Sequence, residues 1–231
     1  MINGIDVSTH QGKIDWAKVK KAGIDFAMLR SSFGWNSSGV DKQFFNNVEG
    51  CNANGIPFGA YHYSYALTPE NARLEADFFL RIVKDTGVSL PLYLDFEDKK
   101  QRALPVEKQV AIIEAFLERV TAAGYKAGLY MSKNSLEVLK KRNEPLLEKY
   151  SIWAAQWNSH LTYSGNCDIW QYSSEGKVDG IATAVDLDYS FVDLPKPEKD
   201  PLDEAAAELE KATKRILELE AKLAEIRAIA E

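Results

Sequence analysis

The sequence predicts an α/β fold, an irregular (β/α) barrel of the TIM type, followed by a C-terminal helix with coiled-coil character. Three observations predict it: eight short β-rich runs, amphipathic stretches between the earlier runs, and an abrupt change of composition near residue 195. Strands that alternate with helices form parallel sheets with crossover helices, and eight such strands suggest a closed barrel. A doubly wound open sheet is the alternative, but no GxGxxG motif or P-loop accompanies the first run.

The eight predicted strands combine aliphatic and aromatic residues and are bounded by turn-forming residues. They cover residues 2–8, 25–32, 57–64, 91–97, 126–132, 151–157, 167–173 and 184–190. The last three lie too close together for full helices between them, so we expect the late crossovers to be loops. In a parallel barrel, the carboxyl ends of all eight strands would face one mouth.

Helical patterns fill the earlier gaps, at 16–22, 40–54, 69–84 and 106–123. Thr68 before Pro69 is typical of an N-cap with proline at the first helical position. A glycine follows each pattern, as expected for helix C-termini: Gly23, Gly55, Gly87 and Gly124.

The composition divides the chain into three parts. Residues 1–194 form the predicted barrel, 195–201 a proline-rich linker, and 202–231 a helix made almost wholly of Ala, Glu, Leu, Lys, Ile and Arg. Apolar residues recur in that helix with the a/d spacing of a coiled coil, so we expect 202–231 to mediate self-association into a homo-oligomer. The a positions are Leu202, Leu209, Ile216, Leu223 and Ala230, and the d positions are Ala205, Ala212, Leu219 and Ile226.

Composition and charge narrow the function. The chain has 231 residues and a formal charge of −6, which argues against nucleic-acid binding through phosphate neutralisation. No apolar run approaches the roughly 20 residues of a membrane helix, and the N-terminus lacks a secretory signal pattern. Two cysteines and three histidines without HExxH or HxxxH spacing predict no zinc or histidine-based metal site, and we expect neither a metal nor a cofactor.

Carboxylates stand at the ends of three predicted strands. Asp95 and Glu97 end the fourth, and strand alternation would place them on one face, about 6–7 Å apart at their Cβ atoms. Such a pair can divide the work of glycoside hydrolysis, one acid donating a proton while the other stabilises the cationic centre or activates a nucleophile. Asp6 ends the first strand and Asp186 lies in the eighth, and because unpaired buried charge is costly, their convergence favours a site over packing.

Aromatic residues on the strands favour a carbohydrate substrate, because sugar rings stack their apolar faces on such side chains while neighbouring polar groups bind the hydroxyls. The expected substrate-binding residues are Tyr61, Tyr63, Trp153, Gln156, Trp170 and Asp188. Gln171 could add a further amide, and His10 is expected to orient a loop.

Five segments together resemble the family-25 glycoside hydrolases, the Chalaropsis-type lysozymes that include many bacteriophage endolysins. They are "GIDVSTHQGKIDW", "GAYHYSY", "LPLYLDFED", "WAAQW" and "IWQYSSEGKVDGI…VDLDY", and the resemblance spans about residues 1–194. It implies a metal-independent N-acetylmuramidase that cuts the β-1,4 bond from N-acetylmuramic acid to N-acetylglucosamine in peptidoglycan. It also implies an irregular barrel.

Carried over residue by residue, the resemblance makes Glu97 the general acid, Asp95 its partner, and Asp6 and Asp186 supporting acids. Asp188 stands where the family often has asparagine. Whether Asp95 acts through the N-acetyl group of the substrate or activates water stays open. An enzyme of this type, made in a host cytoplasm without a signal peptide, would act on the cell wall, and we expect a wall-binding domain beyond Glu231.

Two alternatives remain at this point. The first is a non-catalytic glycan-binding module with the same fold, although both Asp95 and Glu97 are present. The second is a barrel hydrolase with a carboxylate-bound metal. Activity on cell walls in excess chelator would distinguish the second from a muramidase.

Overall fold

A computed structural model describes residues 2–194 and, in the C-terminal part, residues 209, 212–213 and 215–216. The chain divides into two compact units, Met1–Pro195 and Lys196–Glu231. The expected linker at 195–201 and most of the expected helix at 202–231 lie outside the described residues. The five residues of the second unit that are described are helical.

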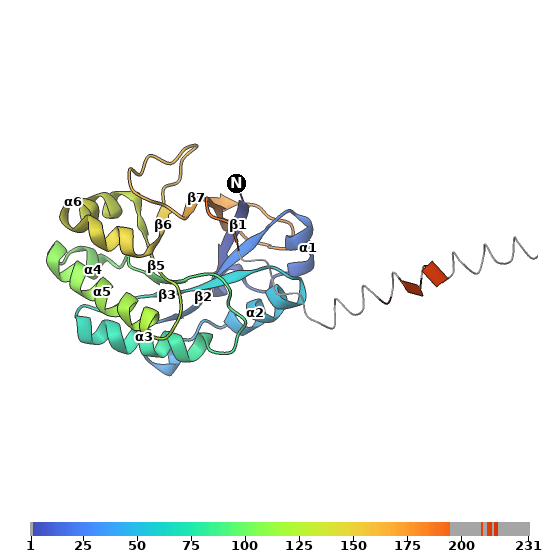
Figure 1. The fold of residues 1–231 in the computed structure, drawn as a ribbon, viewed down its shortest axis with the longest axis horizontal. Coiled ribbons are helices and arrows are strands. Elements are labelled where there is room, and N and C mark those ends of the chain that lie inside the picture. The colour runs from blue at the N-terminus through green and yellow to red at the C-terminus, as the bar shows by residue number, and fades with distance from the viewer. Residues whose placement is uncertain (1, 195–208, 210–211, 214, 217–231) are drawn as a thin grey trace, which may run out of the picture. The chain divides into compact units, whose positions relative to one another are not determined.

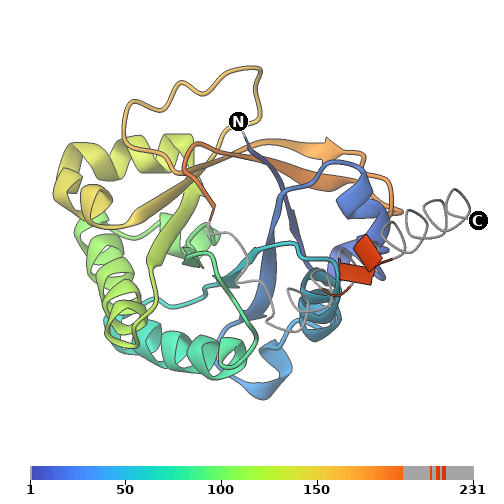
Figure 2. The same cartoon turned by 45° about the vertical axis from the view of Figure 1, so that its right-hand side comes forward.

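The first unit is a closed eight-stranded barrel, and each predicted strand is confirmed to within a few residues. The strands are β1 (Ile2–Val7), β2 (Phe26–Phe33), β3 (Phe58–Tyr63), β4 (Leu92–Asp95), β5 (Ala127–Ser132), β6 (Ser151–Ala155), β7 (Ile169–Gly176) and β8 (Val185–Ser190). Figure 1 shows the strands inside a set of helices, and Figure 2, a turned view, shows that β7 and β8 lack such a cover.

The helices between strands follow the expected order. They are α1 (Trp16–Lys21), α2 (Phe44–Ala53), α3 (Pro69–Val83), α4 (Lys99–Arg102), α5 (Val106–Ala122) and α6 (Lys133–Lys149), with short 3-10 turns at Thr9–Gln11 and Ser37–Gly39. The predicted cap is confirmed, because the Thr68 hydroxyl accepts a hydrogen bond from the Asn71 amide, 3.2 Å away, with Pro69 in the first turn.

Helix α2 begins four residues later than its pattern predicted. Val40 instead forms an antiparallel bridge with Ser32, and the Asp41 carboxylate accepts from the Gln43 amide at 2.9 Å. The carboxylate also accepts from Arg30 Nε at 2.8 Å, so this segment is fixed by an ion pair to β2 before the helix starts.

The alternating pattern had predicted that all eight strands run parallel, and this prediction is wrong for the eighth strand. Strand β8 is antiparallel to both β7 and β1, whereas the pairs from β1 to β7 are all parallel. The connection at 177–184 is shorter than the dozen or more residues that a parallel crossover needs, but suffices for an antiparallel return.

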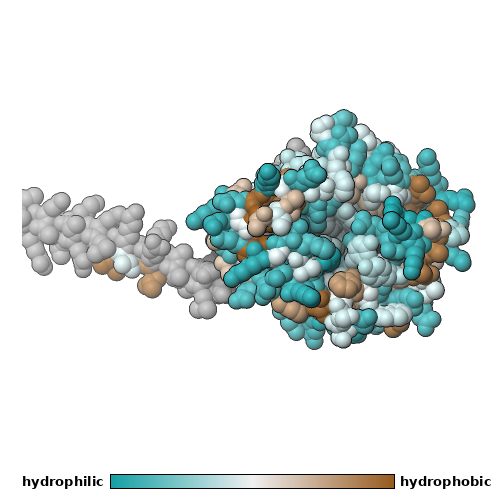
Figure 3. Space-filling model, turned by 180° about the vertical axis from the view of Figure 1, so that it is seen from behind, coloured by the Kyte–Doolittle hydropathy of each residue, from teal (hydrophilic) through white to brown (hydrophobic). Residues whose placement is uncertain are grey.

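Two apolar layers follow from strand alternation. The larger lies between strands and helices and includes Leu92, Leu94 and Phe96 from the β4 segment. The smaller fills the barrel interior, where Tyr93 packs with Phe26 and Trp153. The space-filling view shows hydrophilic residues over most of one face, with apolar ones scattered among them (Figure 3). Among the described residues, no helix has the length and apolarity to cross a membrane.

Candidate active site

Alternation along the β4 segment sends two acids into the barrel mouth. Tyr93 belongs to the interior layer and Leu94 and Phe96 to the outer one, so Asp95 and Glu97 face inward. Both line a cleft of about 290 Å³ at the carboxyl ends of β1 to β6. The backbone is held there on both sides, because Ser64 N donates to the Asp95 carbonyl at 3.0 Å and Phe96 N donates to the Tyr130 carbonyl at 3.1 Å.

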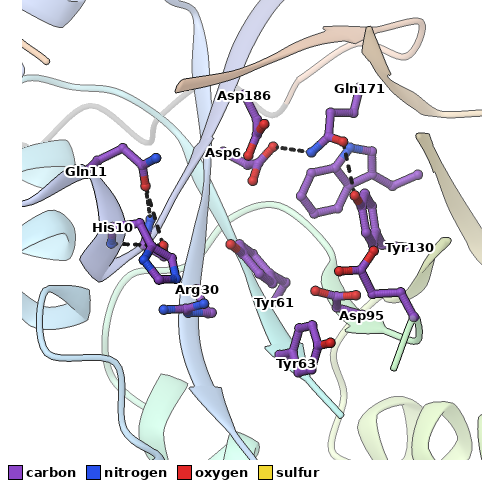
Figure 4. Close-up of a pocket in the computed structure, with 13 residues that line it drawn as sticks. Asp6, His10, Gln11, Arg30, Tyr61, Tyr63, Asp95, Tyr130, Gln171 and Asp186 are labelled. Atoms are coloured by element: carbon purple, nitrogen blue, oxygen red, sulfur yellow. Dashed lines mark hydrogen bonds between the residues drawn. The ribbon is translucent and has the colours of Figure 1, made fainter. Parts of the chain in front are cut away.

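Asp6 and Asp186 complete the acid cluster from the neighbouring strands. Asp6 lies on β1 and pairs in register with Asp186 on β8. Since β8 runs antiparallel, Asp186 reaches the mouth from the beginning of its strand and not from the carboxyl end that the sequence had suggested. Figure 4 shows the two carboxyl groups together at one side of the cleft, with Asp95 across from them.

A hydrogen-bond chain fixes Asp6 on its other side. Gln171 Nε2 donates to Asp6 Oδ2 at 2.7 Å, and Gln171 Oε1 accepts from the Tyr130 hydroxyl at 3.0 Å (Figure 4). The same oxygen accepts from the Trp157 indole at 3.0 Å. Because three strands and a loop contribute to this chain, the position of Asp6 depends on closure of the barrel.

Burial and mutual repulsion shift the acids toward their neutral forms. Burial raises the pKa of Asp6 well above its ordinary range, and the charges of Asp188 and Asp186 raise it further. Burial also raises the pKa of Asp186, and a hydrogen bond from Asp6 lowers it. Since the two carboxylates repel each other when both are ionised, the pair favours a state in which at least one of them is protonated.

The two acids of the β4 segment differ in what opposes their burial. Burial raises the pKa of Asp95 well above its ordinary value, Glu97 adds to the rise, and the guanidinium of Arg30 lowers it. Burial also raises the pKa of Glu97, and the Arg102 charge lowers it. Asp95 Oδ1 is buried and has no hydrogen-bond partner among the described residues, so it is available to a substrate group.

Seven of the ten predicted site residues line the cleft: Asp6, Tyr61, Tyr63, Asp95, Glu97, Trp153 and Asp186. The other three do not. Asp188 is fully buried and accepts from the Trp153 indole at 2.7 Å. Trp170 packs against Tyr172 and Tyr189, and the Gln156 amide donates to Thr162 within its own loop.

The cleft also contains residues beyond these predicted ones. Tyr130 and Arg30, which the sequence analysis did not single out, face inward from β5 and β2. Ser8, His10, Gln11 and Gln171, the last of which was expected as a further amide, complete the lining. The missed signal for Tyr130 and Arg30 was their place near the carboxyl end of a predicted strand, where inward residues reach the mouth. Ser8 caps the turn at Thr9–Gln11, which sets the position of His10.

The described residues contain no group of three or more His, Cys, Asp or Glu side chains placed to hold a metal ion. The arrangement offers instead one partly buried acid, one buried carboxyl with a free oxygen, and aromatic walls. These are the elements of proton donation to a leaving oxygen beside a group that can stabilise positive charge.

Comparison with known proteins identifies a matching family and relatives of this chain. Residues 5–181 match the family model described as glycosyl hydrolases family 25. The uncharacterized protein YegX of Escherichia coli K12 is 32% identical over 196 residues, which cover 80% of this chain and 68% of YegX.

Two crystal structures share the fold. A bacterial lysozyme from Streptomyces coelicolor superposes with a TM-score of 0.72 at 27% identity, over 83% of this chain and 92% of that chain. The catalytic domain of endolysin ply40 from the Listeria monocytogenes bacteriophage P40 superposes with a TM-score of 0.69 at 25% identity, over 82% and 93% of the two chains.

Proposed function

The chain belongs to glycosyl hydrolases family 25, and from this membership we propose that it is an N-acetylmuramidase that uses Glu97 and Asp95. It is a glycoside hydrolase whose substrate is peptidoglycan. The observation that supports the residue assignment is the inward pair at the carboxyl end of β4, with Glu97 partly exposed and Asp95 buried, both lining the cleft.

In the proposed reaction, the Glu97 carboxyl donates its proton to the glycosidic oxygen as the bond to the anomeric carbon breaks. Its raised pKa keeps that proton available. Positive charge develops on the sugar next to Asp95. A buried carboxylate is stabilised by such a charge, which adds to the effect of the Arg30 guanidinium, so the ionised form of Asp95 is favoured as the transition state forms. Water then forms the new bond to the anomeric carbon, and the proton that it releases restores the Glu97 carboxyl group.

Asp6, Asp186 and Gln171 support this pair by holding the far wall of the cleft, and Tyr61, Tyr63 and Trp153 supply faces for sugar rings. Tyr61 and Trp153 meet edge to face with ring centroids 5.7 Å apart, which keeps both rings in fixed orientations.

The bond specificity is tested by the identity of the new reducing end. Purified peptidoglycan is digested, reduced with borohydride, and hydrolysed for sugar analysis. Reduced muramic acid is the expected product. Reduced glucosamine alone would instead identify a glucosaminidase, and new amino groups without reducing ends would identify an amidase.

We propose further that the enzyme serves as an endolysin, which the similarity to the ply40 catalytic domain supports. Its site of action is then the cell wall. Co-expression with a protein that permeabilises the inner membrane should lyse the producing cells, while co-expression of the Glu97→Gln variant should not.

For residues 202–231 we propose self-association into a dimer or tetramer. Leu209 and Ile216, two predicted a positions, are both helical and exposed. Pairing would bury such a stripe at about 25 cal/mol per Å². Sedimentation of the wild type and of a Leu209→Asp, Ile216→Asp variant tests this, and a wild type that stays monomeric at tens of micromolar refutes it.

A further inference from the structure

A second cleft lies beside the active site, at the same end of the barrel. It has a volume of about 270 Å³ and is lined by Gly34, Trp35, Asn36, Tyr65, Ala66, Asn71 and Glu75. Trp35 follows the carboxyl end of β2, and Tyr65 follows that of β3. Both aromatic side chains are about half exposed, at 46% and 51%, although large aromatic residues are usually well buried.

The two clefts are joined by an aromatic contact. Tyr63 lines the active-site cleft, and its ring meets that of Tyr65 edge to face with centroids 5.1 Å apart. Gly34, whose φ of +58° is readily adopted only by glycine, lies below the Tyr65 ring, where an added Cβ would be 3.7 Å from Cδ2. A polymer that leaves the active site past Tyr63 therefore meets Tyr65 next.

The floor of the second cleft is built from a buried polar network. Glu75 is 3% exposed, and its two carboxylate oxygens accept from Tyr65 N at 3.1 Å and from the Ser64 hydroxyl at 2.5 Å. Gln101 Nε2 donates to the same hydroxyl at 2.9 Å. These bonds fix the backbone from which the Tyr65 ring extends, so the base of the cleft is formed before any ligand arrives.

We propose that this cleft is a further subsite that binds a sugar residue of the glycan strand beyond the two sugars at the scissile bond. This inference rests on the proposed function. The Trp35 and Tyr65 rings offer faces to a pyranose, and the side-chain amides of Asn36 and Asn71 lie at the wall, where hydroxyl or acetamido groups would be bound. The cleft has the size of one sugar unit, at the lower end of ligand pockets of roughly 300 Å³.

The test compares a long and a short substrate on the same variants. The long one is a peptide-free octasaccharide of peptidoglycan, and the short one is an aryl glycoside of the disaccharide, which reaches no further than the scissile bond. For Trp35→Ala, Tyr65→Ser we expect kcat/KM on the octasaccharide to fall about thirtyfold, mainly through KM, because the two aromatic contacts contribute about 1 kcal/mol each. The rate on the aryl glycoside should stay within about twofold of wild type.

Two controls accompany this variant. Tyr65→Phe keeps the ring and should retain wild-type activity on both substrates. Phe45→Ala removes an exposed aromatic residue that lines neither cleft, and should also behave as wild type. Calorimetry of the octasaccharide with Glu97→Gln, alone and combined with Trp35→Ala, Tyr65→Ser, gives the binding loss without turnover.

Wild-type kcat/KM values of the variant on both substrates would overturn the subsite and leave the muramidase assignment intact. An equal loss on both substrates would overturn it as well, because the aromatic pair would then support the fold of the active site. A wild type that cuts neither substrate would overturn the proposed function and the subsite with it.

Discussion

Asp6 and Asp186 face each other across the antiparallel β1–β8 pair, in direct register. This one pairing brings an acid from the beginning of the barrel and an acid from its end to the same side of the mouth. The neighbouring inward pair on the same strands is Gly4 and Asp188, which lies deeper and is fully buried. The reversed direction of β8 thus decides which acid of "DLD" reaches the cleft and which lies beneath it.

The buried Asp188 makes stability depend on pH. Burial raises the pKa of Asp188 to about 8, against the Trp153 hydrogen bond that lowers it. The folded state therefore keeps a proton that the unfolded chain releases above about pH 4. The contribution of Asp188 to the free energy of unfolding is therefore fully present below about pH 4 and falls as the pH rises toward 8.

Asp188→Asn removes this dependence, since the amide can still accept from Trp153. We expect a gain of a few kcal/mol in unfolding free energy at pH 7.5 and almost none at pH 4. Denaturant unfolding at both pH values measures it, with exposed Asp193→Asn as the control. A gain equal at both pH values would contradict the assignment.

Two arginines should control opposite limbs of the pH–rate profile. Arg30 lowers the pKa of Asp95, which must be ionised, and Arg102 lowers the pKa of Glu97, which must be protonated. Arg30→Met should thus move the acidic limb of kcat/KM to higher pH, and Arg102→Met should move the alkaline limb to higher pH. If both substitutions move the same limb, the roles of Asp95 and Glu97 are assigned wrongly.

Glu75 should matter more to stability than its place outside the active-site cleft suggests. Its carboxylate accepts hydrogen bonds from the Ser64 hydroxyl and the Tyr65 amide, and its Oε2 lies 3.4 Å from His62 Nε2. The other ring nitrogen, His62 Nδ1, is hydrogen-bonded to the Ser32 hydroxyl at 2.8 Å. Glu75→Ala removes the acceptor of the Tyr65 amide and of the Ser64 hydroxyl and the carboxylate beside His62, and it should cost about 2–4 kcal/mol. Thermal and denaturant unfolding should show no comparable loss for exposed Glu49→Ala.

The strands could be predicted from the sequence, as could the convergence of the four acids at one cleft, because both depend on local pattern. The catalytic roles of these acids stay predictions. Alternation fixes which residues of "LPLYLDFED" face inward, and that pattern is visible without a structure. The direction of β8 was not visible, because alternation is the same for a strand read in either direction. Only the length of 177–184 carried that information.

The sequence could not predict the contacts of side chains whose position depends on neighbouring loops. Gln156 and Trp170 stand on predicted strands, but the Gln156 amide bonds within its own loop and Trp170 packs on Tyr189, so neither lines the cleft. Arg30 and Tyr130 were overlooked because a single inward residue leaves no motif. Arg30 pairs with Asp41, and Tyr130 donates a hydrogen bond to Gln171. Such contacts join residues of different elements, so the sequence around either residue does not reveal them.

The most direct test of the account is the rate at which Glu97→Gln releases reducing ends from purified peptidoglycan. The amide preserves the shape of the side chain but has no acidic proton for the leaving oxygen, so the rate should fall by at least about a hundredfold. Circular dichroism and unfolding should match wild type. A folded Glu97→Gln protein that keeps more than about a tenth of the wild-type rate would contradict the account, since general acid catalysis contributes far more than that.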